Sequence, residues 1–230
     1  MNKDIVIIIG AYGSGKSEYA INYVWQLKQQ EIPVTLVDLD VVNPYFRSRE
    51  VREDFARQDI IVIAPDGEYT HADMPMLSPR IMGAVQDISR KPVLDVGGDP
   101  AGCRTLARYV QNIKNRGYQL KVVINTKRPF TSDHKGIIQL LESLEYSSRL
   151  KVTELVCNTN LMEYTDEAAI SDGIKIISGV AEELKLKFSE YLVMEKYADR
   201  IPENLLGKKR VLLQYYLNKP WEKSKVHGVI

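Results

Sequence analysis

The chain has 230 residues, of which 44% are hydrophobic and 27% charged, and its formal net charge is +1. This composition is typical of a soluble globular protein with one sizeable α/β core, and the near-neutral charge does not favour a nucleic-acid partner. Two distant cysteines argue against a disulfide framework or a metal knuckle and indicate a reducing cytoplasm. No apolar stretch approaches the ~20 residues of a membrane span, and the N-terminus leaves no room for a signal peptide.

A glycine-rich loop follows the first apolar run, residues 4–9. Five consecutive β-branched residues in that run predict a strand buried on both faces. The loop fits G-x-x-x-x-G-K-[ST], a pattern in which backbone N–H groups cradle phosphates, Lys16 reaches the β- and γ-phosphates and Ser17 ligates Mg²⁺. Its residues are Gly10, Ala11, Tyr12, Gly13, Ser14, Gly15, Lys16 and Ser17. A helical pattern follows, and we include its Glu18 among the predicted nucleotide-binding residues.

Apolar runs that predict strands recur along the chain, at residues 4–9, 33–38, 59–64, 92–96, 119–125 and 151–157. Segments with helical periodicity lie between most of them, including one after Ser132-Asp133 and one from Thr165 to Glu183. This alternation predicts an α/β fold with a doubly wound, mainly parallel sheet, helices on both faces, and ligands beyond the carboxyl ends of the strands. We expect a single domain over 1–230, with residues 195–230 as a C-terminal extension packed on it.

Two carboxylates follow the second predicted strand. Asp38 and Asp40 occupy alternate positions and therefore point the same way. This suits one acid that holds Mg²⁺ through water and another that orients an attacking water, because phosphoryl transfer mainly needs positioning and charge stabilisation. A solvated strand end is the alternative. In the loop beyond, we expect Asn43, Arg47 and Arg49 to form a switch that senses the nucleotide and shows its state to a partner.

The region from Asp66 to Pro79 has no convincing period and is longer than most connections in compact domains. We expect it to contact a partner or substrate. It contains His71, which is expected to be a solvated bystander, because a lone histidine in a polar loop is more often that than a catalyst.

The fourth predicted strand ends in an acid and a pair of glycines. Asp95 fits the second contact to Mg²⁺, commonly made through water. Asp95 to Gly98 spells D-x-x-G, whose glycine N–H can bond the γ-phosphate and whose loop can move when that phosphate leaves. Asp99 is an alternative acid in the same switch loop. Cys103 lies near a helix start that would favour a thiolate, but a buried inert thiol is the preferred interpretation.

The loops after the fifth and sixth strands bear on the choice of base. GTP-specific proteins use N-K-x-D, and no aspartate stands at the required place after Asn125. Asn158 follows the next strand and supplies an amide that can both donate and accept where an adenine edge would lie. ATP is therefore favoured over GTP, although asparagine at a strand end is also ordinary turn chemistry.

The C-terminal segment is basic and apolar. A membrane-surface helix is one interpretation, but apolar residues lie on nearly every side and Pro220 interrupts the segment, which favours packing onto the domain.

With these motifs placed, the chain resembles the Min/Par/nitrogenase-iron-protein class of P-loop NTPases, which includes the CobQ/CobB, MinD and ParA nucleotide-binding domains. The resemblance spans roughly residues 1–190 and implies a parallel sheet, Mg²⁺ and ATP, switch loops after the second and fourth strands, and often a nucleotide-dependent homodimer. By position, Lys16 and Ser17 would bind phosphate and Mg²⁺, and Asp40 would orient the attacking water. The resemblance implies further roles in metal support for Asp38 and Asp95 and in adenine contact for Asn158.

One departure concerns the homodimer. Dimer-forming members carry a second loop lysine where this chain has Ala11, so activation by a partner copy would need another cation such as Arg47, Arg49 or Arg104.

Three hypotheses follow. The first is a cytoplasmic Mg²⁺-dependent ATPase that switches a protein partner, in the maturation of a metalloenzyme for example. The second is an ATP-dependent small-molecule kinase or carboxylate-activating ligase, with which Glu18 and the 66–79 loop are compatible. The third is a membrane-cycling positioning ATPase, which the sequence favours least.

Overall fold

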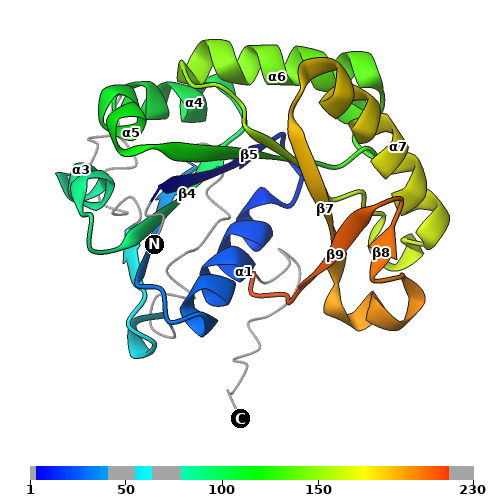
Figure 1. The fold of residues 1–230 in the computed structure, drawn as a ribbon, viewed down its shortest axis with the longest axis horizontal. Coiled ribbons are helices and arrows are strands. Elements are labelled where there is room, and N and C mark those ends of the chain that lie inside the picture. Colours follow the sequence, from blue (N-terminus) through cyan, green and yellow to red (C-terminus); the bar gives the residue numbers. More distant parts are fainter. Residues whose placement is uncertain (1–3, 41–54, 64–78, 218–230) are drawn as a thin grey trace.

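The computed structural model describes residues 4–40, 55–63 and 79–217. They form a nine-stranded sheet in the order β3-β2-β4-β1-β5-β6-β7-β9-β8 (Figure 1). Neighbouring strands are parallel except for the β8–β9 pair. The strands are β1 (Ile5–Gly10), β2 (Val34–Leu39), β3 (Ile61–Ile63), β4 (Lys91–Gly97), β5 (Tyr118–Ile124), β6 (Glu154–Cys157), β7 (Lys187–Met194), β8 (Asn204–Leu205) and β9 (Lys208–Leu213).

Helices cover both faces of this sheet. Figure 1 shows α1 on one face and α4, α6 and α7 on the other. The longer helices are α1 (Lys16–Gln29), α3 (Pro79–Gln86), α4 (Pro100–Ala107), α5 (Val110–Arg116), α6 (His134–Ser148) and α7 (Glu167–Leu184). The arrangement confirms the expected doubly wound, mainly parallel α/β fold.

Local sequence accounts for most of these elements. All six residues of β1 are buried, as its run of β-branched side chains predicts for a central parallel strand. Asp133 and Asp166 begin α6 and α7 by accepting the main-chain N–H groups of Gly136 and Ala169, each at 2.8 Å. Such N-caps satisfy donors that have no partner within the helix. The expected helices after Ser132-Asp133 and over 165–183 are thereby confirmed within a few residues.

The sequence did not predict the last three strands. β7 follows the sixth expected strand, and β9 pairs with it in parallel from Glu190–Lys209 to Met194–Leu213. Charged residues interrupt the apolar pattern of both strands, which is why periodicity did not reveal them. Within the predicted C-terminal extension, residues 204–213 therefore enlarge the main sheet.

None of the helices in the described part of the chain combines the length and the apolar character that a membrane span needs.

Candidate nucleotide site

The glycine-rich loop lies at the carboxyl end of β1, between β4 and β5. Gly13 and Gly15 adopt φ values of +74° and +85°, in the left-handed region where side chains are rarely tolerated. Gly10 is required for a different reason, because a Cβ there would lie 2.4 Å from the carbonyl oxygen of Val123. The loop backbone thus has the conformation and the close packing that the phosphate-binding pattern anticipates.

Lys16 points from this loop toward the acids at the carboxyl end of β2. Its Nζ lies 2.8 Å from Asp40 Oδ2, and both side chains are buried. Burial alone would lower the pKa of Lys16, but Asp95, Asp40 and Asp38 together raise it above its ordinary value. Lys16 therefore carries a positive charge that three neighbouring carboxylates stabilise.

Asp38 and Asp95 face each other across neighbouring strands, since they are register partners in the β2–β4 pair. Burial, followed by the charge of Asp95, raises the pKa of Asp38 well above its usual range, although the main-chain N–H of Asp40 donates to Asp38 Oδ1 at 3.0 Å. Burial likewise raises the pKa of Asp95 to about 6, against the opposing effects of Lys16 and Ser17. Two adjacent buried carboxylates favour a bound cation or proton.

Asp95 is the buried acid whose oxygens best fit a bound cation. Both of its carboxylate oxygens are buried without a hydrogen-bond partner. The Ser17 hydroxyl lies near enough to lower the pKa of Asp95, but the pair does not have hydrogen-bond geometry. Buried acceptors are normally paired, so these oxygens fit a role in holding Mg²⁺ or its water.

The described residues include no group of three or more histidine, cysteine or acidic side chains that could hold a metal ion by themselves. Mg²⁺ typically takes one or two carboxylates together with substrate phosphates and waters. The donor set of Ser17, Asp38 and Asp95 fits an ion that arrives with a nucleotide.

Two side chains hold the carbonyl groups of the loop. Asn158 Nδ2 donates to the carbonyl oxygen of Ser14 at 2.6 Å, and Arg128 Nε donates to that of Gly13 at 3.2 Å. Both donors come from loops that follow strands β5 and β6. By fixing these carbonyls, they stabilise the loop conformation. Sequence reasoning missed Arg128, whose neighbourhood only the fold reveals.

Asn125 joins the loops after β5 and β6. Its Oδ1 accepts the main-chain N–H groups of Lys127 (2.9 Å) and Asn160 (3.2 Å), and its Nδ2 donates to the Asn160 carbonyl. Its amide is therefore committed to loop structure, as is the Nδ2 of Asn158 to the phosphate loop. Base contacts by Asn125 and Asn158 stay predictions.

The loop after β4 packs directly on the phosphate loop. A Cβ on Gly98 would lie 2.0 Å from the carbonyl oxygen of Gly10, so only glycine permits this approach. Asp99 Oδ1 accepts the N–H of Gly102 at 3.0 Å at the start of α4, which is the arrangement of a helix cap. Cys103 is buried, and burial raises the pKa of its thiol to about 12, which favours the inert interpretation.

Glu18 contacts the C-terminal part of the chain. Its Oε1 accepts the N–H of Tyr216, and its Oε2 accepts that of Leu217 at 3.3 Å. Burial raises the pKa of Glu18 to about 7, against the effect of these two donors. We name residues 214–217 the C-terminal strap. The Glu18 carboxylate is thus directed to the strap, and nucleotide contact by Glu18 stays a prediction.

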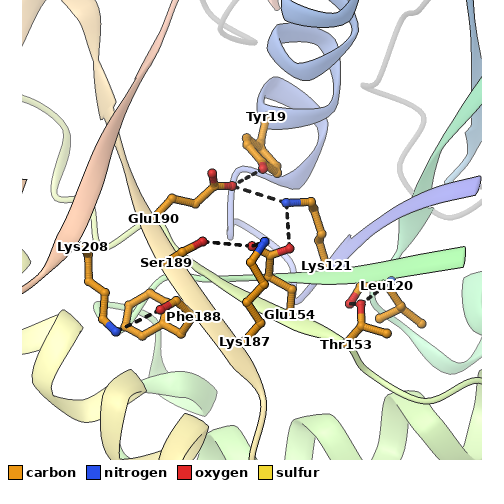
Figure 2. A network of polar contacts seen from close by, with 10 residues as sticks. All are labelled: Tyr19, Leu120, Lys121, Thr153, Glu154, Lys187, Phe188, Ser189, Glu190 and Lys208. Carbon is orange, nitrogen blue, oxygen red and sulfur yellow. Dashed lines mark hydrogen bonds and ion pairs between the residues drawn. The ribbon is translucent and has the colours of Figure 1, made fainter. Parts of the chain in front are cut away.

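A second set of polar contacts joins α1 to the sheet (Figure 2). Lys121 Nζ lies 3.0 Å from Glu154 Oε2 and 3.6 Å from Glu190 Oε1, and Lys187 Nζ lies 3.1 Å from Glu154 Oε1. The Tyr19 hydroxyl donates to Glu190. The only sequence signal for this network is that Lys121 and Glu154 interrupt apolar strand runs.

The remaining predicted positions differ in what the structure says of them. Ala11 accepts the N–H of Ser14 at 3.0 Å within the loop, and Tyr12 is 82% exposed at its tip. Arg104 is exposed on α4. Several predicted positions lie outside the described residues: the switch residues Asn43, Arg47 and Arg49, and His71 with most of the 66–79 loop.

No protein-family model and no curated protein sequence matches the chain. Solved structures do match it. FtsY from Mycoplasma mycoides aligns with a TM-score of 0.56 and 13% identity, over 84% of this chain and 61% of that one. Cell division protein FtsY from Thermotoga maritima gives 0.55 and 15%, over 85% and 64%. Signal recognition particle receptor FtsY from Elizabethkingia anophelis, in complex with GDP, gives 0.53 and 15%, over 86% and 60%.

At these identities the likeness shows the fold. The chain has the P-loop NTPase fold. It spans about three fifths of the length of the FtsY structures that it matches. The P-loop, residues 10–17, thus lies in the fold that its pattern predicts, while the narrower resemblance to the Min/Par class stays a prediction.

Proposed function

We propose that this P-loop protein is a Mg²⁺-dependent nucleoside triphosphatase that uses ATP and acts as a nucleotide switch for a protein partner. The observation that carries this proposal is the meeting of Lys16 with Asp38, Asp40 and Asp95 at one loop, with the buried oxygens of Asp95 unpaired. A cation and three acids around a glycine loop suit phosphoryl transfer, which relies on positioning and charge stabilisation.

The Lys16–Asp40 ion pair suggests the order in which phosphate binds and the attacking water is oriented. Lys16 Nζ lies against Asp40 Oδ2. When a triphosphate takes Lys16, this contact is exchanged for one to phosphate, and the Asp40 carboxylate can then orient an attacking water. Mg²⁺ neutralises charge on the phosphates when it is bound, and Ser17, Asp38 and Asp95 are the residues that would hold it, directly or through water.

The contact between Gly98 and Gly10 supports a switch. Because Gly98 lies against the P-loop backbone, a change in the phosphates is transmitted directly to the loop after β4. That loop continues into α4, which would carry the change toward a partner surface. The suggestion that the partner is a metalloenzyme under maturation comes from the class resemblance.

The preference for ATP is supported by the loop after β5. Residues 125–131 contain no carboxylate that could accept hydrogen bonds from guanine. One matched FtsY structure holds GDP, so ATP and GTP must be compared side by side. Tighter binding of Mg²⁺-ATP supports the proposal, whereas a preference for GTP would overturn its choice of base.

The first prediction concerns Asp40. Asp40→Asn keeps the shape of the side chain but cannot orient water as a carboxylate, and it frees Lys16. We expect ATP affinity to be retained or increased and single-turnover hydrolysis to fall roughly 100-fold or more, the usual contribution of a positioned acid or base. Rapid-quench measurements at saturating ATP test this. Hydrolysis at the wild-type rate would show that another residue orients the water. In a separate screen of wild-type protein with metabolites and ATP, a phosphorylated or amidated product would favour the small-molecule enzyme.

A further inference from the structure

Helix α1 carries a stripe of side chains that face the C-terminal strap. Glu18, Asn22 and Trp25 are spaced four and three residues apart, so they lie on one face of the helix. All three contact the strap. The helix that begins with Lys16 and Ser17 thus presents a separate surface to a segment about 190 residues later in the chain.

The strap continues the chain after β9 ends at Leu213. Asn22 Nδ2 donates to the carbonyl oxygen of Gln214 at 2.9 Å, and the N–H of Gln214 donates to Asn22 Oδ1 at 2.8 Å. This reciprocal pair imitates the bonding between two strands. Further along, Tyr216 stacks on Trp25, with ring centroids 6.0 Å apart and an interplanar angle of 15°. Side chains of α1 therefore form hydrogen bonds with main-chain groups of the strap.

Glu18 is the closest link between the strap and the P-loop. It is adjacent to Ser17, and its carboxylate is held by the N–H groups of Tyr216 and Leu217. An acid in the first turn of a helix competes with bound phosphate for the positive end of the helix dipole. While the strap is docked, the Glu18 carboxylate accepts hydrogen bonds from the strap and competes less with phosphate for the helix terminus. Undocking would exchange these hydrogen bonds to a carboxylate for hydrogen bonds to water, which is a net loss because hydrogen bonds to charged groups inside a protein are stronger than average.

We propose that Glu18 and Asn22 are positioning residues through which the docked strap supports the P-loop, so that strap docking and nucleotide binding favour one another. This inference rests on the proposed nucleotide binding. Coupling between two sites is reciprocal: if the docked strap raises nucleotide affinity, bound nucleotide must stabilise the docked strap by the same factor. Each half of this statement can be measured separately.

The closing experiment uses the full chain with Mg²⁺-ATP as the probe. Hydrogen exchange at the amides of Tyr216 and Leu217 reports strap docking, and calorimetry reports ATP affinity. The main variant is Asn22→Ala, because Asn22 lies a turn beyond Ser17 and contacts the strap. Glu18→Ala and Glu18→Gln form a second pair, in which glutamine keeps an acceptor oxygen for the strap.

Glu145→Ala is the matched control. Glu145 on α6 accepts the N–H of Val152 at 2.9 Å and pairs with Lys151, so it repeats the carboxylate-to-backbone contact far along the chain from the P-loop. Its substitution tests whether any loss of such a contact weakens ATP binding through general loosening of the fold.

We expect Mg²⁺-ATP to slow exchange at the two strap amides, and Asn22→Ala to weaken ATP binding by at least about fivefold, the lower end of typical coupling. The loss should appear in KM and leave kcat nearly unchanged. Glu18→Ala should speed exchange at the two strap amides, Glu18→Gln should restore part of that protection, and Glu145→Ala should bind ATP like the wild type.

Two results would overturn the inference. In the first, the wild type binds ATP, yet strap exchange does not respond to it and Asn22→Ala retains wild-type affinity; the proposed function then stands without the coupling. In the second, Glu145→Ala weakens binding as much as Asn22→Ala, which assigns the effect to general loosening. Absence of any nucleotide binding by the wild type would remove the proposed function together with the inference.

Discussion

Strands β1 and β7 both contribute to the sheet face beside α1, but they contact that helix in different ways. β1 packs with six buried residues in an apolar run and delivers the P-loop at its end. β7 contributes Glu190, which accepts the Tyr19 hydroxyl and belongs to the network of Figure 2. The apolar side can be recognised from a short stretch of sequence, whereas the polar side depends on residues that meet only after folding.

This difference separates two tasks. The elements around β1 supply the groups expected to touch the nucleotide: Lys16, Asp40 and Asp95. The elements around β7 and β9 hold the helix from which two of the expected ligands extend. We therefore expect variants on the first side to change chemistry and variants on the second side to change stability and helix position.

The largest stability effect is expected in the network. Lys121→Met leaves Glu154 buried with one fewer partner and should lower the free energy of unfolding by about 3–5 kcal/mol, the usual cost of breaking a buried pair. Chemical denaturation monitored by circular dichroism measures this. Adding Glu154→Leu removes the stranded charge and should recover most of the loss. If the single variant is as stable as the wild type, the network does not hold α1.

A smaller effect is expected at Asn158, which holds the P-loop. Asn158→Ala removes the donor to the Ser14 carbonyl. Losing one hydrogen bond should lower the free energy of unfolding by about 1 kcal/mol, and ATP affinity should fall by up to about fivefold because the nucleotide must then order the loop itself. Calorimetry compares it with Asn115→Ala, which removes an exposed contact with Gln111 on α5. Equal ATP affinities for both variants would show that the P-loop does not depend on the hydrogen bond from Asn158.

The smallest effect is expected at Cys103. With a thiol pKa of about 12, its thiolate fraction stays near one in a thousand even at pH 9. Raising the pH from 7 to 9 should therefore leave Cys103 unreactive toward iodoacetamide in the folded protein, with rapid alkylation only after denaturation. Mass spectrometry of the labelled peptide provides the readout. Alkylation of the native protein at pH 7 would favour a reactive thiolate near the helix start.

The sequence predicted the six strands from β1 to β6 because their apolar runs are nearly continuous, and it predicted the P-loop because its residues are adjacent. It also singled out Asp38, Asp40 and Asp95 as candidates, since each lies close to the carboxyl end of an apolar strand. Their convergence on Lys16 required the β2-β4-β1 strand order, which periodicity does not contain.

The contacts of Glu18, Asn22 and Arg128 could not be predicted in the same way. Each pairs with a backbone group more than 100 residues away. Because nearly every residue carries the same backbone groups, the sequence does not show which one a side chain will contact. Glu18 illustrates the consequence. Its place beside the P-loop suggested nucleotide contact, whereas its partners are amides of the C-terminal strap.

Calorimetry with Mg²⁺-ATP on the wild type and on Lys16→Ala tests the central claim most directly. The wild type should release heat with one nucleotide bound per chain, and Lys16→Ala should bind at least about 100-fold more weakly, because it loses the charged donor to phosphate. Absence of heat from the wild type with either ATP or GTP, or equal affinity of the two proteins, would contradict a nucleotide site built on this loop.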